Sequence, residues 1–562
     1  MLKRHQAFVG VIAFGTAILV AVAHAQVGRG GSAWLTAHGD AQRTSWIRSD
    51  ALISVATMSK PGFQLQWKTP LENENRGSYG IGSGVSAPGV TLFVPMSLVA
   101  GSSNNVYAID SDTGYLVWQR HFDALPPAAT AACPGGTTSS PTRIVSLEPP
   151  PISEGAQPGG GGRNTQGYHS VLGQPGEGAP VEVRSGGPGR GGAAPAGGRG
   201  TTGPPNAAGG AAAGAAPGGQ RAGAPPPGRG AGQGGGRGGG EPIPGAPPAQ
   251  VGGGGGLGRP SGVVYVISSD GMLHVMGLQS GKDLQRPAPF VPANSRWSDP
   301  IAVGTMLYTS TSGGCGGAPD AVWAIDLESE SKPVVSWKSE APIVGSLAFT
   351  TDGTLVAVTG SAIVTLDAKT LQVKDTLKAP GSDFITGPTI VQYGQNEAIA
   401  AGTKNGHVFL FRVVNATPSF AADSDFPSGS LVAADALATW QTADAPATRW
   451  LLAPTKDSVA ALRFSEPPQL PSVTPGWMAA NLAAPATPII VNGVVFVLER
   501  GSTAVLHAYD GTTGKELWTS GKTMTAAAAP GSFWSAFSQI YVGTTDGTLY
   551  AFGFDDERHS NP

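Results

Sequence analysis

Arginine, aspartate and aromatic residues occur directly before several segments that predict β-strands. Arginine pairs with carboxylates and stacks on rings, aspartate accepts hydrogen bonds, and tryptophan offers a flat apolar surface. Together they could hold a small polar ring such as a sugar or a quinone, or they could be ordinary loop residues that fill space. The candidate binding residues are Arg143, Arg296, Trp297, Asp299, Asp383, Phe384, Asp435, Phe533 and Trp534.

The histidine pattern predicts no metal site and no nucleophile. The nine His residues are scattered, with no HExxH motif and no paired spacing. His274, His407 and His507 fall inside predicted strands, where packing is the ordinary role. We therefore assign no catalytic residue and no metal ligand from the sequence.

Only two cysteines are present, Cys133 and Cys315. Their number excludes a CxxCH haem site, a vicinal disulfide and any multi-cysteine zinc site. Both lie in glycine-rich loops, so in an oxidising compartment they could form a disulfide, or they could be two thiols that never meet. The sequence leaves both alternatives open, because pairing depends on geometry.

The N-terminus has the pattern of a secretory signal. A basic start (Lys3, Arg4) precedes an apolar run and the triplet Ala23-His24-Ala25, which predicts cleavage after Ala25 and a periplasmic or secreted protein. The alternative is a retained membrane anchor. No later stretch is apolar and long enough to cross a bilayer, so we expect no stable membrane span in the mature chain.

One short pattern recurs along the chain: Ala-x-Asp, a few polar residues, Thr-Gly, three residues and Trp. The clearest copies are Ala108–Trp118 (AIDSDTGYLVW) and Ala508–Trp518 (AYDGTTGKELW). In each copy the Asp should accept backbone N–H bonds in a turn, and the Gly should take the left-handed conformation. The Trp residues of such hairpins, at 67, 118, 337 and 518, should pack between neighbouring units.

The repeats predict an all-β, eight-bladed propeller of four-stranded antiparallel blades. The strands are near-continuous apolar runs, which indicates burial on both faces, and the period of about 40 to 50 residues is typical of propellers. With 84 Gly and 48 Pro, an all-helical protein is nearly excluded. The predicted units begin near Val90, Val263, Ile301, Leu347, Pro388, Leu437, Pro485 and Phe533.

The last unit supplies only about three strands, whereas Gly62–Thr69 is an orphan strand with Trp67 at the outer position. We expect this N-terminal strand to complete the final blade and close the ring, which removes free sheet edges. The binding candidates would then lie at the mouth of the central channel.

The predicted organisation has four parts: 1–25 signal peptide, 26–143 N-terminal segment, closing strand and first blade, 144–260 insert, and 261–562 remaining blades. The insert between the first and second blades is rich in Gly, Pro, Ala and Arg. It has too few large apolar groups to offset its ordering entropy, so we expect it to be mostly disordered.

The motif AxDxxTGxxxW resembles the repeat of pyrroloquinoline-quinone (PQQ) type propellers. Trp34–Trp46 (WLTAHGDAQRTSW) is similar to the WxxxGGDxxxTRxS segment of quinoprotein alcohol dehydrogenases, with His38 where the first Gly is usual. The resemblance implies an eight-bladed fold and makes PQQ and calcium possible cofactors. The same repeat also belongs to binding propellers, such as the outer-membrane assembly-factor lipoprotein.

Three functions remain open after this comparison. The favoured one is a binding or scaffold module of the cell envelope, whose partner is an envelope protein or a small polar ligand. The alternatives are a PQQ-dependent alcohol or sugar dehydrogenase with a divergent site and a carbohydrate-binding propeller. Basic charge is concentrated in the insert, where eight Arg and four Glu lie between 151 and 260. The remaining chain is acidic, which argues against nucleic acid as partner, and we expect a monomer.

Overall fold

The computed structural model describes residues 33–76, 79–87, 95–123, 133–137, 139–148, 262–378, 383–393, 396–414, 417–425, 436–444, 446–465 and 472–555. All of them belong to the larger of two compact units, Met1–Gly173 with Gly258–Pro562. The predicted signal (1–25), Asp435 and the segment 149–261, which holds nearly all of the insert, lie outside the described residues.

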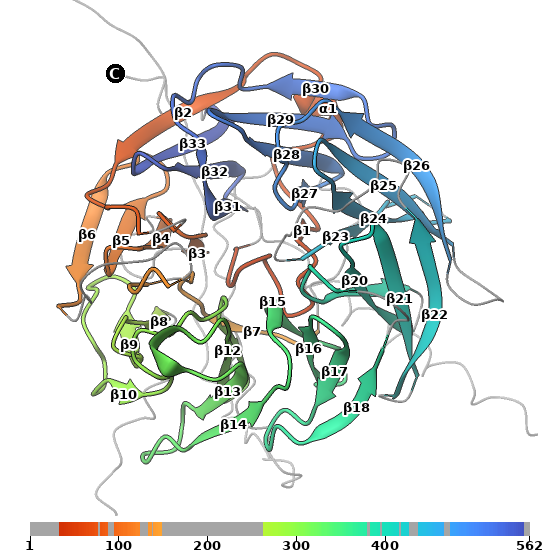
Figure 1. Cartoon of the computed structure of the whole chain (residues 1–562). Coiled ribbons are helices and arrows are strands. Elements are labelled where there is room, and N and C mark those ends of the chain that lie inside the picture. Colours follow the sequence, from red (N-terminus) through yellow and green to blue (C-terminus); the bar gives the residue numbers. More distant parts are fainter. Residues whose placement is uncertain are drawn as a thin grey trace, which may run out of the picture. The chain divides into compact units, whose positions relative to one another are not determined.

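Eight small sheets succeed one another around a ring in this unit, as the repeats predicted (Figure 1). Blades 1 to 4 contain β3–β6 (Val85–Ala87, Met96–Gly101, Asn105–Asp110, Leu116–His121); β8–β10 (Val263–Ile267, Met272–Gly277, Ala288–Pro289); β11–β14 (Ile301–Val303, Met306–Thr311, Ala321–Asp326, Val334–Lys338) with β7 (Ile144–Val145); and β15–β18 (Ile343–Phe349, Leu355–Thr359, Ile363–Leu366, Val373–Leu377).

Blades 5 to 8 contain β19–β22 (Thr389–Tyr393, Asn396–Gly402, His407–Val414, Thr417–Asp425); β23–β26 (Ala438–Gln441, Arg449–Pro454, Ser458–Ser465, Ser472–Ala480); β27–β30 (Ile489–Val491, Val494–Arg500, Ala504–Asp510, Glu516–Thr519) with β1 (Trp46–Ile47); and β31–β33 (Ala528–Ala536, Gln539–Thr544, Thr548–Phe554) with β2 (Phe63–Pro70). The helices of the described residues are α1 (Val55–Met58) and the 3-10 turn η1 (Cys315–Gly317). Neither is long enough to cross a membrane, and no other described helix could do so.

Strand β2 closes the ring, which confirms the prediction from the orphan strand. It pairs antiparallel with β33, from Phe63 opposite Phe554 to Pro70 opposite Thr548. The hydrophobic core lies between sheets rather than within one: a single cluster joins Tyr107 of blade 1, Phe496 of blade 7 and Trp534 of blade 8. Closure therefore places the two ends of the chain's ordered part in one core.

The insert leaves the ring from inside blade 2, and not between the first two blades as the hairpin count predicted. Thr142 and Tyr265 exchange two backbone hydrogen bonds, at 2.9 and 2.8 Å, so the inner strand of blade 2 precedes the insert and β8 follows it. The next residues form β7, which pairs parallel with β11 of blade 3. The pattern near Val263 was the second strand of its blade.

The turns of the repeat form as the sequence predicted. Asp110 Oδ1 accepts the backbone N–H groups of Asp112 and Thr113, at 2.8 and 3.3 Å, and Asp510 Oδ1 accepts those of Thr512 and Thr513, at 2.8 and 3.1 Å. The same bonding occurs at Asp326 and Asp367. These carboxylates are turn formers.

The glycine that follows each turn supports a tryptophan of the preceding blade. Gly114 has φ +73°, and a Cβ placed on it would lie 2.6 Å from the ring of Trp67, whose Nε1 donates to the Ser111 carbonyl at 2.9 Å. Trp118 meets Gly281 in the same way and donates to Leu278. Only glycine accommodates both the left-handed backbone and the approach of the ring.

A second repeated turn escaped the sequence reasoning. Between the second and third strands of three blades, a hydroxyl donates to an Asp two residues later: Ser268 to Asp270, Thr350 to Asp352, and Thr544 to Asp546. The signal was available as a Ser/Thr-x-Asp-Gly series at these places. Such Asp-Gly turns favour tight hairpins.

Candidate functional site at the ring centre

The N-terminal segment Trp34–Ile47, which we call the hub, occupies the centre of the ring (Figure 1 shows β1 there). Its carbonyls accept backbone N–H groups from the inner strands of successive blades: Trp34 from Ser86, Leu35 from Arg143, Ala41 from Phe349, Gln42 from Ile390, Thr44 from Thr439, and Ser45 from Ile490, all at 2.8 to 3.0 Å. Since these donors lie on strand edges that face the channel, the hub satisfies groups that water would otherwise have to reach.

Arg43 ties the hub to blades 3 and 4. Its side chain is fully buried. Nε donates to the Leu347 carbonyl at 2.7 Å and Nη2 to the Asp299 carbonyl at 3.2 Å, while Nη1 reaches Thr36 Oγ1 and the Ala37 carbonyl. The guanidinium thus acts as a structural cross-link made mainly to neutral carbonyls.

His38 is the unusual residue of the hub. It holds φ +58°, a conformation that favours glycine, and this explains why the resembling motif has Gly at that position. Its Nδ1 lies 2.9 Å from Ser45 Oγ. Burial and the nearby Arg43 lower the pKa of His38 to about 4, against an opposing effect of Asp299. The imidazole is therefore neutral at pH 7.

Asp299 is the candidate that lies closest to the hub. Its Oδ1 accepts both the N–H and the hydroxyl of Ser140 at 2.7 Å, and Ser346 Oγ lies 3.5 Å from Oδ2. Carboxylate, neutral imidazole and hydroxyl groups thus gather at the ring centre. Such a set can bind the hydroxyl groups of a small polar ligand.

The other candidates take separate places. Arg143 is buried and its Nε donates to the Val263 carbonyl at 3.2 Å. Trp297 is buried, with Nε1 2.8 Å from Ser139 Oγ. Arg296 is exposed, with its guanidinium 5.7 Å from the ring centre of Tyr79. These three side chains have separate partners and do not form a shared binding surface.

The aromatic candidates are part of the core. Phe384 is buried and packs edge-on against Phe409. Phe533 is also buried. Trp534 is fully buried, stacks on Tyr541 at 5.0 Å, and is approached so closely by Gly84 that a Cβ there would lie 2.4 Å from the indole. Asp383 is exposed, and its carbonyl accepts the Lys404 N–H.

The residues present do not fit a calcium-bound quinone. Calcium takes about six to eight oxygen ligands, and a planar quinone needs an open aromatic face and nearby cations. Trp534 has no open face, Arg143 is directed to a backbone carbonyl, and one Asp299 oxygen already accepts two bonds. Within the described part of the chain, no group of three or more His, Cys, Asp or Glu could hold a metal ion. We derive no step through either cofactor.

Blade 2 contains a Ser–His–Asp series that the sequence reasoning missed. Ser268 Oγ lies 2.9 Å from His274 Nε2, and His274 Nδ1 lies 3.1 Å from Asp283 Oδ1, which matches the order of groups in serine hydrolases. Ser268 is almost fully buried, however, and has the turn position that threonine takes in blades 4 and 8. Asp283 also pairs with Arg120. The series is a structural network.

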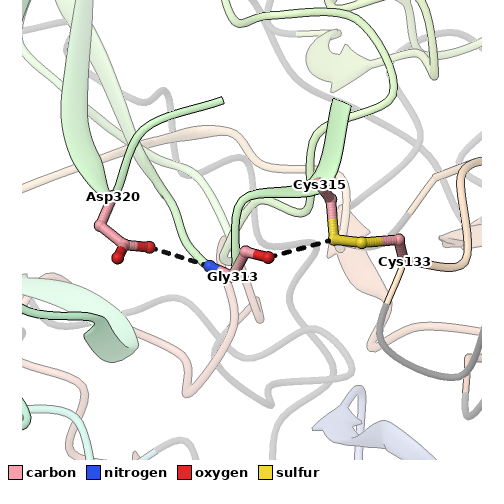
Figure 2. The surroundings of a disulfide bond; sticks show 4 residues. All are labelled: Cys133, Gly313, Cys315 and Asp320. Carbon is pink, nitrogen blue, oxygen red and sulfur yellow. Dashed lines mark hydrogen bonds between the residues drawn. A yellow bond between two sulfur atoms is a disulfide. The ribbon is translucent and has the colours of Figure 1, made fainter. Parts of the chain in front are cut away.

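Cys133 and Cys315 form a disulfide across 182 residues of sequence, with their Cα atoms 5.3 Å apart (Figure 2). Beside it, the Gly313 N–H donates to Asp320 Oδ1 at 2.8 Å. The bond links the segment before blade 2 to a loop of blade 3, so it brackets blade 2 and the insert covalently.

One open depression is found outside the ring centre. It has a volume of about 470 Å³ and lies where the chain after β2 crosses the top of blade 1. Its lining residues are Leu71, Glu72, Asn73, Glu74, Ser103, Asn105 and His121. The sequence reasoning named none of these, because they come from the end of the closing strand and from blade 1.

Known structures share the fold. The quinohemoprotein alcohol dehydrogenase from Comamonas testosteroni is 13% identical, with 93% of this chain and 80% of that chain covered and a TM-score of 0.50. A europium-containing methanol dehydrogenase is 10% identical over 93% of this chain and 98% of that chain, with a TM-score of 0.51. BamB from Moraxella catarrhalis is 15% identical over 52% of this chain and 82% of that chain, with a TM-score of 0.37. No family model matches the chain. At these identities the likeness concerns the propeller fold alone.

Proposed function

We propose that this chain is an exported PQQ-repeat propeller that acts as a binding or scaffold module of the cell envelope. The hub carries this proposal. The chain's own segment fills the ring centre with backbone bonds and the buried Arg43. The ligand of such a module binds at the surface of the ring or as a small polar molecule beside Asp299.

Export is supported by two features. The N-terminal sequence has a basic start, an apolar run and Ala-His-Ala, and the Cys133–Cys315 disulfide suits an oxidising compartment. A periplasmic or secreted location follows from both.

The second candidate is a PQQ-dependent alcohol or sugar dehydrogenase. The extent of its fold similarity to two dehydrogenases favours it, and the residues described at the ring centre oppose it. A carbohydrate-binding propeller is the third candidate, for which the hydroxyl and carboxylate groups around Asp299 are the relevant feature.

A dye-linked assay separates these functions. Purified protein is mixed with PQQ and Ca²⁺, then with a panel of alcohols and aldose sugars, and dye reduction and binding heat are measured. We expect no turnover. Turnover that disappears in Asp299→Asn but persists in the blade 3 control Asp320→Asn would establish the dehydrogenase. Binding heat with a sugar alone would favour the carbohydrate-binding function.

A further inference from the structure

The outer strand of blade 1 carries an exposed apolar run. Tyr115, Leu116 and Val117 are 76%, 45% and 47% exposed, and among the described residues they are the only three consecutive large apolar residues that are exposed. Strand β6 is the last strand of its sheet. Its outer backbone groups therefore form an edge on which another strand can pair.

Other blades do not have this feature at the same position. In blade 7, which has the other clear copy of the repeat, Lys515 and Glu516 replace Tyr115 and Leu116. Glu516 accepts from His507, whose other nitrogen faces Glu499. Charged residues on an edge oppose pairing with another strand, so blade 7 is protected where blade 1 is open.

The other end of the same edge is acidic. His121, the last residue of β6, lines the depression together with Glu72 and Glu74, both of which are exposed. Their backbone is fixed on blade 1: the Glu72 carbonyl accepts from Asn105 and Tyr107, and the Glu74 carbonyl accepts from Ser102 and Ser103. Two carboxylates are thus held at one end of an apolar edge.

We propose that β6 binds an extended segment of a partner protein that combines basic and alternating apolar residues. The segment pairs antiparallel with β6, places its apolar side chains beside Tyr115 and Val117, and places its cation in the depression beside Glu72 and Glu74. An extended chain advances about 3.3 Å per residue, so roughly five residues separate the two anchors. This inference deepens the proposed binding function by naming a surface and a class of partner.

The test uses a fluorescent peptide, Lys-Arg-Thr-Val-Thr-Val-Thr, and fluorescence anisotropy with the full protein. We expect Tyr115→Lys with Leu116→Glu, which copies blade 7, to weaken binding at least tenfold. The matched blade 7 variant Lys515→Ala with Glu516→Ala should bind like the unchanged protein. Glu72→Gln with Glu74→Gln should weaken binding and reduce its dependence on salt.

A second measurement needs no variant. Alternate N-methylation of the peptide removes the N–H groups that pair with an edge, so the methylated peptide should lose binding, and the plain peptide should slow amide hydrogen exchange in Leu116–His121. Equal binding of the methylated peptide, unchanged exchange in β6, or no binding to the unchanged protein would overturn the proposal. A dimer of the free protein that the Tyr115 and Leu116 changes dissolve would assign the edge to a second copy instead. None of these results depends on the dye-linked assay.

Discussion

Blades 1 and 7 have the same turn and different outer surfaces. Asp110 and Asp510 accept the same two backbone N–H groups, and Gly114 and Gly514 have φ of +73° and +71°. The three residues that follow are Tyr-Leu-Val in blade 1 and Lys-Glu-Leu in blade 7. Backbone chemistry fixes the turn, whereas the solvent side of the outer strand is free to diverge, and there the difference between binding and non-binding blades can arise.

The tryptophans of the two blades also meet different neighbours. Trp118 lies on Gly281 and donates to the Leu278 carbonyl. Trp518 meets the ring of Phe63 edge-on at 4.9 Å, because the outer strand of blade 8 is β2 and arrives from the N-terminal side. Blade 7 therefore depends on the closing strand, and blade 1 depends on a glycine turn.

Removal of residues up to Thr69 should have the largest effect on this difference. The deletion takes away the hub and β2, including buried Trp34 and Phe63, and each large buried ring contributes about 3–5 kcal/mol. We expect loss of a cooperative melt by circular dichroism. Phe63→Ala alone should lower the melting temperature by a smaller amount, and an unchanged melt of the deletion would refute ring closure as a source of stability.

Reduction of Cys133–Cys315 should come next. A closed loop of 182 residues is worth about 5 kcal/mol in the chain-entropy model, with measured values often lower. The melting temperature should fall on addition of reductant and in Cys133→Ser. Reductant should not change the melt of Cys133→Ser any further; if it did, the reductant would be acting elsewhere.

Glycine substitutions test the tryptophan supports directly. Gly281→Ala under Trp118 and Gly514→Ala under Trp477 each add a Cβ 2.6 or 2.8 Å from an indole, in left-handed backbone, and each should cost about 2–4 kcal/mol by urea denaturation. Gly521 shares a positive φ of +53° but has open space around it, so Gly521→Ala should cost only about 1 kcal/mol. Equal losses at all three positions would mean that backbone strain alone matters.

The hub should show the smallest effect, as a dependence on pH. Because burial lowers the pKa of His38 to about 4, the folded protein takes up its proton later than the unfolded chain does. This contribution to stability is complete above pH 6.5 and is lost as the pH falls toward 4. His38→Asn, which tolerates the left-handed backbone, should flatten the melting-temperature profile over this range; parallel profiles would contradict the assignment.

The sequence predicted features that depend on neighbouring residues. The Asp and Gly of each turn, the apolar strands and the closing strand with Trp67 were all legible, because turn chemistry and periodicity are local. The hub was not, since each of its bonds is one backbone contact to a blade as distant as Ile490. The segment before Trp534 looked like a loop at the channel, whereas β31 begins at Ala528 and has an irregular register before Phe533, which places Trp534 between blades.

The most direct test of the account is hydrogen exchange by mass spectrometry on the full protein, with PQQ and Ca²⁺ in one sample and the basic-apolar peptide in another. We predict that the peptide protects Leu116–His121 and that PQQ protects neither Ser139–Arg143 nor Trp297–Pro300. Protection of the segment around Asp299 by PQQ, with β6 unchanged by the peptide, would contradict a binding module that works through its outer surface.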